Sequence, residues 1–594
     1  VRTLELFESG ATRSLQGSLL HVLDQTMTPM GARLLRQWLG QPLVDVGAIR
    51  ARQDHVAEAL GDAIVRARIA ESLRSVGDLE RRTARAVQRQ ASPRDVLAIG
   101  RALGAVSALR ELGNRQGAAT PLLSELLIGL SDNADVGDLI ARAINPDPPA
   151  SFGEGVIRTG FSEELDELLR STSDSREWIA GLEAAERERT GIRSLRVGYN
   201  RVFGYYIEVT HANTALVPPH YERKQTLVGA ERYVTPELKH HEQLLASAQE
   251  RRIELETNLF AQVCEAIQNA RERLLATAAD LARLDVICSL AEVAERNSYT
   301  RPIVDDGPAI RIVDGRHPVV EVSRRDEPFV PNSAELSTDD AQILLITGPN
   351  MAGKSTYLRQ VALITILAQI GSFVPAREAR IGIVDRVFTR IGAQDDISSG
   401  RSTFLVEMTE AANMLTQCTP RSLLVLDEIG RGTSTYDGLA IAQAVLEHIH
   451  NEPSARARTL FATHYHELTD LAETLPRLRN YRMAVSEEGG KVTFLRRVEP
   501  GAADRSYGIH VARLAGLPAS VTRRAESILR ELERGGHGTR RATRPQPGSW
   551  QLSFIEPDGI AEEIRDLDLL SMSPLEALTR LFELQRRVRE GPAR

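Results

Sequence analysis

Apolar residues are spaced differently in the two halves of the chain. Residues 1–150 carry Leu-, Ala- and Arg-rich segments with helical spacing, separated by turn signals such as Thr28-Pro29 and Ser92-Pro93. A second helical run begins near Ser162. Between residues 301 and 530, short apolar strands alternate with helices, which is typical of a parallel α/β sheet. The pattern therefore predicts a helical first half and a mixed α/β second half.

The segment between these halves changes character twice. Residues 195–235 are alternating, β-branched and aromatic, with Gly and Pro between the runs, and this predicts short strands. From Pro236 to about Asn297 there follows one helical pattern without an internal Pro or Gly. About 60 residues at ~1.5 Å each would form a rod of roughly 90 Å. We therefore predict a small β module inserted at the tip of an antiparallel helical pair, and a plain coiled-coil spacer is the alternative.

Composition narrows the class of protein. A length of 594 residues suggests three or four domains at ~100–200 residues each. The formal net charge is −7, so any contact with nucleic acid must come from a local basic surface. The three cysteines have no CxxC spacing, which argues against a disulfide framework and a thiolate metal site. Because no signal pattern or membrane span is visible, we expect a cytoplasmic protein with no membrane contact.

A glycine-rich loop carries the strongest chemical signal. Residues 348–355 fit the spacing G-x₄-G-K-[ST], between an apolar strand at 342–347 and a helix from Thr356. Backbone N–H groups of such a loop and the helix N-terminus face phosphates. Lys354 would neutralise the β- and γ-phosphates, and the Ser355 hydroxyl would ligate Mg²⁺. We therefore expect ATP and Mg²⁺ as cofactors. The expected nucleotide-binding residues of the loop are Gly348, Pro349, Asn350, Met351, Ala352, Gly353, Lys354, Ser355 and Thr356.

Two later strand ends supply the remaining parts of an ATPase. The apolar run 422–426 ends in Asp427 and Glu428, where Asp427 can hold the Mg²⁺ shell and Glu428 can polarise the attacking water. A strand at 459–463 ends at His464, which could hold the γ-phosphate or the water. We therefore predict Glu428, His464 and Lys354 as catalytic residues, with Ser355 and Asp427 as metal ligands. A surface acidic pair and a structural histidine are the alternatives.

The sequences around these motifs resemble the MutS family, a branch of the ABC ATPases. The resemblance extends to the start of the family's core domain, to its clamp and to its helix-turn-helix dimerisation element. The matching stretches are 347–356, 427–438 and 461–465 in the ATPase, 28–38 in the core, 199–209 and 223–238 in the clamp, and 506–518 in the helix-turn-helix.

The resemblance implies a multidomain fold. It has an α-helical core and lever arms with an inserted small β clamp, then an α/β ABC-type P-loop ATPase domain with a helix-turn-helix and a C-terminal helical tail. We place the boundaries as follows: 1–160 helical core, 161–194 lever helix, 195–236 DNA-binding β clamp, 237–300 lever helix returning to the core, 301–505 ATPase domain, 506–533 helix-turn-helix dimerisation element, 534–556 flexible linker, and 557–594 C-terminal helical segment.

The resemblance also implies binding residues outside the loop. Ser402 would reach the γ-phosphate of the partner's ATP in a head-to-tail homodimer, and Phe329 would stack on adenine. Arg482 stands where the family often has a second base contact, a His. Apart from the resemblance, the basic residues of the β insertion are expected to touch DNA phosphates, with solvated loop charge as the alternative; they are Arg201, Arg223, Lys224 and Arg232.

As a function, the resemblance implies an ATP-dependent sliding-clamp protein of DNA mismatch repair. It would hydrolyse ATP at composite dimer sites to gate its grip on double-stranded DNA. A MutL-type partner and the replication sliding clamp are the further partners implied. An ATPase acting on recombination intermediates or DNA junctions, without mismatch recognition, is the alternative. A DNA-binding scaffold with a degenerate nucleotide site and a transporter subunit fit less well, because the phosphate motifs are intact and the helical arm is long.

The two ends of the sequence leave questions open. Complete family members begin with a mismatch-binding domain, with a Phe-x-Glu wedge, and a connector domain. Phe152-Gly-Glu154 matches the wedge letters but lies between core helices, so we do not assign it. Val1 stands in place of Met, and both a truncated sequence and a natural lineage without these domains remain open.

Near the other end, Gln551-Leu-Ser-Phe-Ile555 resembles the peptide by which bacterial repair proteins bind the sliding clamp, with packing on its own ATPase domain as the alternative.

Overall fold

The computed structural model describes residues 2–10, 12–116, 120–324, 327–349, 351–392, 403–488, 491–502 and 508–536. The chain forms two compact units, Val1–Ala515 and Gly516–Arg594, and each is described by itself. Asn350, Ser402, most of the predicted linker, the sliding-clamp peptide and the C-terminal helical segment lie outside the described residues.

The first part of the chain is a helical core. Thr28 caps helix α2 by accepting a hydrogen bond from the Gly31 N–H, and Pro29 occupies the first helical position, so this turn signal marks a helix start. Pro93 likewise begins α6. The helices are α1 (Leu19–Leu23), α2 (Pro29–Gly40), α3 (Val46–Gly61), α4 (Ala63–Val76), α5 (Leu79–Val87), α6 (Pro93–Gln116), α7 (Pro121–Gly129) and α8 (Ala134–Ala143).

Helices α9 (Glu163–Thr190) and α10 (Pro236–Asn269) form an antiparallel pair. Ser175 faces His241 at 3.2 Å, and farther along the pair Glu164 accepts a hydrogen bond from Arg251 at 2.6 Å. The prediction of one unbroken helix from 236 to 297 is wrong. The helix breaks at Ala270, and α11 (Arg271–Arg296) contacts α2 to α5 of the core. No Pro or Gly marks the break in the sequence.

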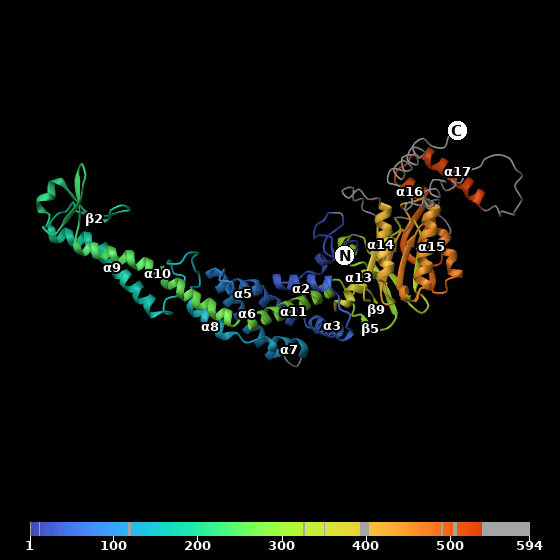
Figure 1. The fold of residues 1–594 in the computed structure, drawn as a ribbon, viewed down its shortest axis with the longest axis horizontal. Coiled ribbons are helices and arrows are strands. Elements are labelled where there is room, and N and C mark those ends of the chain that lie inside the picture. Colours follow the sequence, from blue (N-terminus) through green and yellow to red (C-terminus); the bar gives the residue numbers. More distant parts are fainter. Residues whose placement is uncertain are drawn as a thin grey trace, which may run out of the picture. The chain divides into compact units, whose positions relative to one another are not determined.

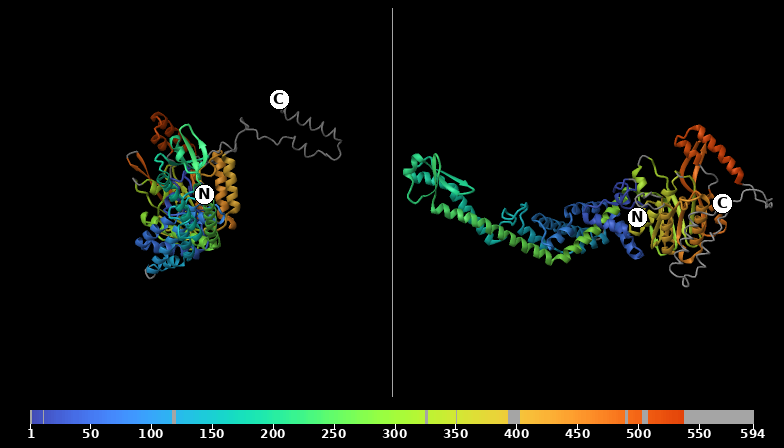
Figure 2. Two further views of the ribbon diagram at one scale, coloured as in Figure 1. Left: turned by 90° about the vertical axis from the view of Figure 1, so that its left-hand side faces the viewer. Right: turned by 45° about the horizontal axis from the view of Figure 1, so that its top comes forward.

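A small antiparallel sheet connects α9 to α10, where the β module was predicted (Figure 1). Its strands are β1 (Arg196–Asn200), β2 (Gly204–Thr210), β3 (Glu222–Thr226) and β4 (Ala230–Val234), in the order β1-β2-β4-β3. The 3-10 helix η1 (His211–Leu216) follows β2. Ile207, Val209 and Tyr233 of the sheet share a hydrophobic cluster with Ile179 of α9 and Leu238 of α10. The sheet is therefore packed on both helices (Figure 2).

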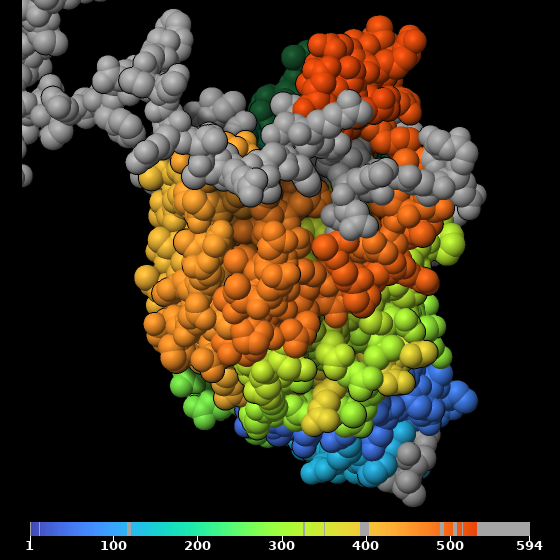
Figure 3. Space-filling view, turned by 90° about the vertical axis from the view of Figure 1, so that its right-hand side faces the viewer, coloured from blue at the N-terminus to red at the C-terminus, as the bar shows by residue number. Residues whose placement is uncertain are grey.

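The α/β part contains a six-stranded sheet in the order β10-β11-β12-β8-β13-β14. All neighbours are parallel except the edge strand β14, and the three central strands are wholly buried. Its strands are β8 (Ile343–Thr347), β10 (Val387–Arg390), β11 (Leu423–Asp427), β12 (Arg458–Thr463), β13 (Leu478–Glu488) and β14 (Lys491–Pro500). Its helices are α13 (Lys354–Gln369), α14 (Thr403–Gln417) and α15 (Thr435–Asn451), with the 3-10 helices η3 (Pro453–Ala455) and η4 (His466–Glu473). Residues of α14 and α15 contribute to the orange surface in Figure 3.

A second sheet of four strands packs beside it, in the order β5-β9-β6-β7. Its elements are β5 (Ile303–Asp305), β6 (Ala309–Gly315), β7 (Asn332–Ser337) and β9 (Glu378–Gly382), with helix α12 (Pro318–Ser323) between β6 and β7.

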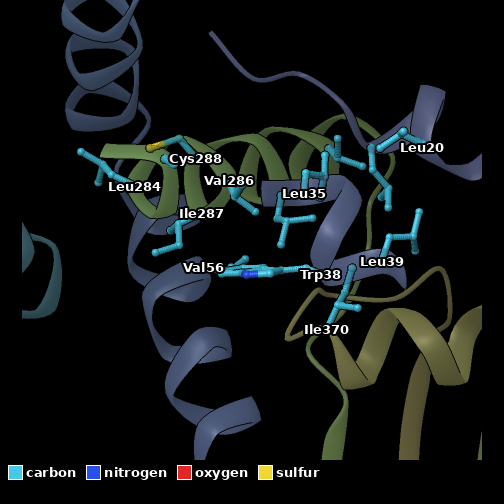
Figure 4. Close-up of a cluster of buried hydrophobic side chains, with 14 of the residues drawn as sticks. Leu20, Leu35, Trp38, Leu39, Val56, Leu284, Val286, Ile287, Cys288 and Ile370 are labelled. Atoms are coloured by element: carbon cyan, nitrogen blue, oxygen red, sulfur yellow. The ribbon is translucent and has the colours of Figure 1, made fainter. Parts of the chain in front are cut away.

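One hydrophobic cluster runs from the helical core into the α/β part. Trp38 and Leu39 of α2 lie beside Ile370, which follows α13 (Figure 4). The Arg52 guanidinium lies 3.5 Å from the Trp38 ring centroid and donates a hydrogen bond to the Ile370 carbonyl at 3.1 Å. The Gln369 amide donates to the Leu43 carbonyl at 2.8 Å. The core and the α/β part thus share a continuous interior.

Helix α16 (Gly508–Leu514) ends the first unit, and helix α17 (Ala519–Gly536) lies in the second. Both fall mostly within the predicted helix-turn-helix at 506–533. None of the described helices combines the length and the apolar character needed to cross a bilayer.

Candidate active site

The glycine-rich loop lies at the carboxyl end of β8, between the central strand and helix α13. Gly348 and Gly353 have φ angles of +138° and +105°, which L side chains rarely adopt. A Cβ at Gly348 would also lie 3.0 Å from the Cβ of Met483. Because α13 begins at Lys354, its free N–H groups face the loop. This is the strand-loop-helix arrangement that the motif predicts.

Lys354 is buried in this loop. Its side chain donates a hydrogen bond from Nζ to the Gly348 carbonyl at 2.5 Å, and the residue is only 3% exposed. Burial lowers the pKa of Lys354 to about 8, although the nearby Glu428 and Asp427 carboxylates raise it. An anionic ligand in the loop would restore the stability of the ammonium.

Asp427 and Ser355 form the candidate metal position. Asp427 ends β11, is buried, and accepts a hydrogen bond from the Ser355 hydroxyl. Burial raises the pKa of Asp427. Its Oδ1 is buried without a hydrogen-bond partner in the described part of the chain. Two hard oxygen donors with one unused lone-pair site fit Mg²⁺, which usually takes one or two protein ligands and fills its shell with water and phosphate oxygens.

Glu428 follows Asp427 in an uncommon backbone conformation. Its φ is +58°, and its N–H donates to the Ala462 carbonyl of β12 at 2.9 Å. The carboxylate receives hydrogen bonds from His464 at Oε1 and from Arg431 at Oε2, the latter at 2.5 Å. The hydrogen bond from His464 is the main cause that lowers the pKa of Glu428 to about 2. The structure thus brings the predicted base and the predicted histidine into direct contact.

The segment after Glu428 is fixed by a buried carboxylate. Glu407 of α14 accepts a hydrogen bond from the Gly430 N–H at 2.6 Å and pairs with Arg390 at 3.6 Å. A Cβ at Gly430 would lie 2.5 Å from the Gly438 carbonyl, so the segment folds closely on itself. The sequence assigned no role to Glu407 or Arg431. Arg431 could have been found from its position three residues after the predicted base. No neighbouring residue in the sequence indicates the role of Glu407.

Comparison with known proteins identifies the family. The models of MutS domain III and MutS domain V match residues 1–291 and 344–533. A protein of Dehalococcoides mccartyi named DNA mismatch repair protein MutS is 50% identical over 99% of this chain and 68% of its own length. Proteins of the same name from Chloroflexus aurantiacus and Acetivibrio thermocellus are 50% and 49% identical, over 65% and 68% of their lengths.

The chain belongs to the MutS family. Proteins of this family bind ATP and are ATPases. The chain spans about two thirds of the length of these relatives.

Phe329, the expected adenine contact of MutS proteins, lines a cavity of about 320 Å³. Met351, Gly353 and Thr356 of the glycine-rich loop and the first turn of α13 line the same cavity. The cavity therefore adjoins the glycine-rich loop. Arg482, in contrast, faces Glu499 across the β13–β14 pair at 3.9 Å.

The four predicted DNA-binding residues all lie on the β1–β4 sheet or its turns, but their surroundings differ. Arg201 lies exposed in the turn after β1. Arg223 has a long ion pair of 3.5 Å with Glu231, and the Lys224 ammonium donates to the Phe203 carbonyl at 2.6 Å. Arg232 is the most engaged: it donates to Glu208 and Gln225, lies 4.0 Å over the Tyr206 ring, and its side chain is 18% exposed.

Proposed function

We propose that this chain is a Mg²⁺-dependent ATPase that converts ATP and water to ADP and phosphate. The observation that carries the proposal is the convergence of Lys354, Asp427 and Glu428 at the carboxyl ends of β8 and β11. These residues come from segments more than 70 positions apart in the sequence.

The geometry supports a division of roles. The loop N–H groups and Lys354 would bind the β- and γ-phosphates, and Phe329 would contact the adenine. Ser355 and Asp427 would hold Mg²⁺, which when bound neutralises charge that develops on the phosphate oxygens. Glu428 would polarise the attacking water, and His464 would orient the Glu428 carboxylate.

Exposed apolar side chains of three segments support a homodimer that closes the site. Met351 of the loop, Leu405 of α14 and Tyr436 of α15 are 71%, 57% and 84% exposed, so they are available for burial against a second copy. A second copy that covers these residues would bring its own Ser402 to the γ-phosphate, as the resemblance implies.

The biological role that we propose is DNA mismatch repair, with ATP hydrolysis gating the grip of a sliding clamp on duplex DNA. The name of the relatives supports this role. The attachment of the clamp also supports it. Glu183 of α9 accepts from the Val197 N–H at 3.0 Å, and Glu242 of α10 accepts from the Tyr205 N–H at 3.1 Å. A movement of either helix would therefore move the clamp. A MutL-type partner and binding of the 551–555 peptide to the replication sliding clamp belong to the same proposal.

A phosphate-release assay on the purified chain tests the enzymatic part. We expect Mg²⁺-dependent release of phosphate from ATP, and loss of release when Mg²⁺ is chelated. If ATP binds with Mg²⁺ present and no phosphate appears, with or without duplex DNA, the chain is a nucleotide-binding protein and not an ATPase.

A further inference from the structure

Both carboxylate oxygens of Glu428 are engaged in the nucleotide-free structure. Oε1 is bonded to His464, and Oε2 is bonded to Arg431 at 2.5 Å. A cation bonded to a carboxylate stabilises its charge and therefore weakens it as a base. A water held for hydrolysis would have to share this carboxylate with both partners.

Of the two partners, Arg431 is the one that can leave. His464 directly follows β12, whose Ala462 is in register with Asp427 of β11, so its position is tied to the sheet. The Arg431 side chain is 67% exposed and makes no other hydrogen bond within the described residues. The backbone beside it is fixed, because Gly430 donates to Glu407 and accepts from the Tyr465 hydroxyl at 3.1 Å. Arg431 thus extends an exposed side chain from a backbone that is held by hydrogen bonds at Gly430.

Arg431 lies beside the phosphate-binding loop. Its partner Glu428 directly follows Asp427, and Asp427 accepts a hydrogen bond from Ser355, the residue after Lys354. A triphosphate bound at Lys354 brings several negative charges into that neighbourhood. Its phosphate oxygens compete with the single Glu428 carboxylate for the guanidinium, which binds phosphate in the same bidentate manner as carboxylate.

We propose that Arg431 is a positioning residue that exchanges partners, holding Glu428 before nucleotide binds and moving to the nucleotide's phosphates afterwards. The exchange removes Arg431 from Oε2 of Glu428 when ATP is in place, and so leaves this oxygen more open to the attacking water. This proposal rests on the proposed ATPase function.

A double-mutant cycle in nucleotide binding tests the exchange. The affinity for a non-hydrolysable ATP analogue with Mg²⁺ is measured for the wild type, Glu428→Gln, Arg431→Ala and the double variant. If Arg431 must leave Glu428 to reach the phosphates, Glu428→Gln frees it in advance and tightens binding. We expect a gain of up to about fivefold, the scale of one exposed ion pair. In the Arg431→Ala background that gain should disappear.

Glu428→Gln also removes the repulsion between this carboxylate and the phosphates, which would tighten binding. This effect should be equal in the wild type and in the Arg431→Ala variant. An equal gain with and without Arg431 therefore overturns the exchange. Arg431→Gln serves as a second neutral variant and should repeat the result of Arg431→Ala. Arg377→Ala is the matched control, because Arg377 is 66% exposed and pairs with Asp314. In the Arg377→Ala variant, Glu428→Gln should tighten analogue binding as much as it does in the wild type. If Arg377→Ala abolished this gain, the proposal would also be overturned. Because binding alone is measured, a chain that binds but fails to hydrolyse ATP contradicts the proposed function without deciding the exchange.

Discussion

Lys354 shows how burial prepares a single residue for an anionic ligand. The ammonium is almost completely buried and bonded to a backbone carbonyl, and its pKa is lowered to about 8. Bound phosphates would favour the charged form and raise that pKa. ATP binding above pH 8 must therefore be accompanied by proton uptake at Lys354.

We predict that ATP affinity falls as the pH rises through about 8. Below this pH Lys354 is already protonated in the free protein, whereas above it each binding event must recruit a proton. The decline should approach tenfold per pH unit, the limit for one coupled proton. Calorimetric titrations between pH 7 and 9.5, in buffers of different ionisation enthalpy, measure both the affinity and the proton uptake. Lys354→Arg keeps its charge throughout this range, so its affinity should lack the decline. A decline of equal size in that variant would assign the titration to another group.

At the scale of elements, Glu256 of α10 anchors the loop that leads into α9. Its side chain is buried and accepts hydrogen bonds from the N–H groups of Gly153, Gly155 and Val156. Arg252, one turn earlier on α10, donates to the same carboxylate at 3.1 Å. Residues 152–154 thus lie in a loop that is held by Glu256. We therefore assign them no role as a mismatch-binding wedge.

We predict that Glu256→Ala lowers the free energy of unfolding by about 3 kcal/mol, because it leaves several donors without a partner in a buried position. Glu254→Ala is the matched control. Glu254 lies on the same helix with its side chain 59% exposed, and its loss should change stability by less than about 0.5 kcal/mol. Urea unfolding followed by circular dichroism compares them. Equal effects of the two variants would mean that the loop is not held by Glu256.

The clamp sheet gives a second prediction at this scale. Arg223 and Lys224 of β3 are exposed, and we expect them to contact phosphates without reading sequence. The double variant Arg223→Ala with Lys224→Ala should weaken matched and mismatched duplexes by the same factor, and should reduce the salt slope of binding by about 2. Fluorescence anisotropy over a salt series measures both quantities. Arg377→Ala with Arg380→Ala removes two exposed charges, one just before β9 and one within it, and should leave binding unchanged. Unaltered affinity in the clamp variant would place the DNA contacts elsewhere.

The features that could be predicted from the sequence are those that depend on residues close together along the chain. The glycine-rich loop and the strand ending in Asp427 and Glu428 have local signatures, and parallel strands then bring their carboxyl ends to one edge. The short strands of the clamp were visible for the same reason. The break at Ala270 was not predicted. The contacts of Glu256 and Glu407 were also missed, because the groups that they bind lie 100 or more and 23 residues away in the sequence, respectively. Arg431 was within a recognised motif, but only the side-chain geometry shows its contact with Glu428.

In the proposed homodimer, two copies of the chain form each active site. If Ser402 acts on the partner's nucleotide while Lys354 acts on its own, Ser402→Ala and Lys354→Ala subunits are each inactive alone. Mixing them should restore one competent site per heterodimer. ATPase assays on mixed subunits, with heterodimers confirmed by differential tags, measure this. Confirmed heterodimers that stay inactive would contradict a shared site.

In the proposed reaction, Glu428 polarises the water that attacks ATP. Glu428→Gln keeps the size and hydrogen-bonding ability of the side chain but removes the base. Single-turnover hydrolysis, measured alongside ATP binding on the same protein, separates chemistry from affinity. We predict that the variant binds ATP and hydrolyses it at least ~10²-fold more slowly than the wild type. A variant that binds ATP and hydrolyses it at nearly the wild-type rate would contradict the account.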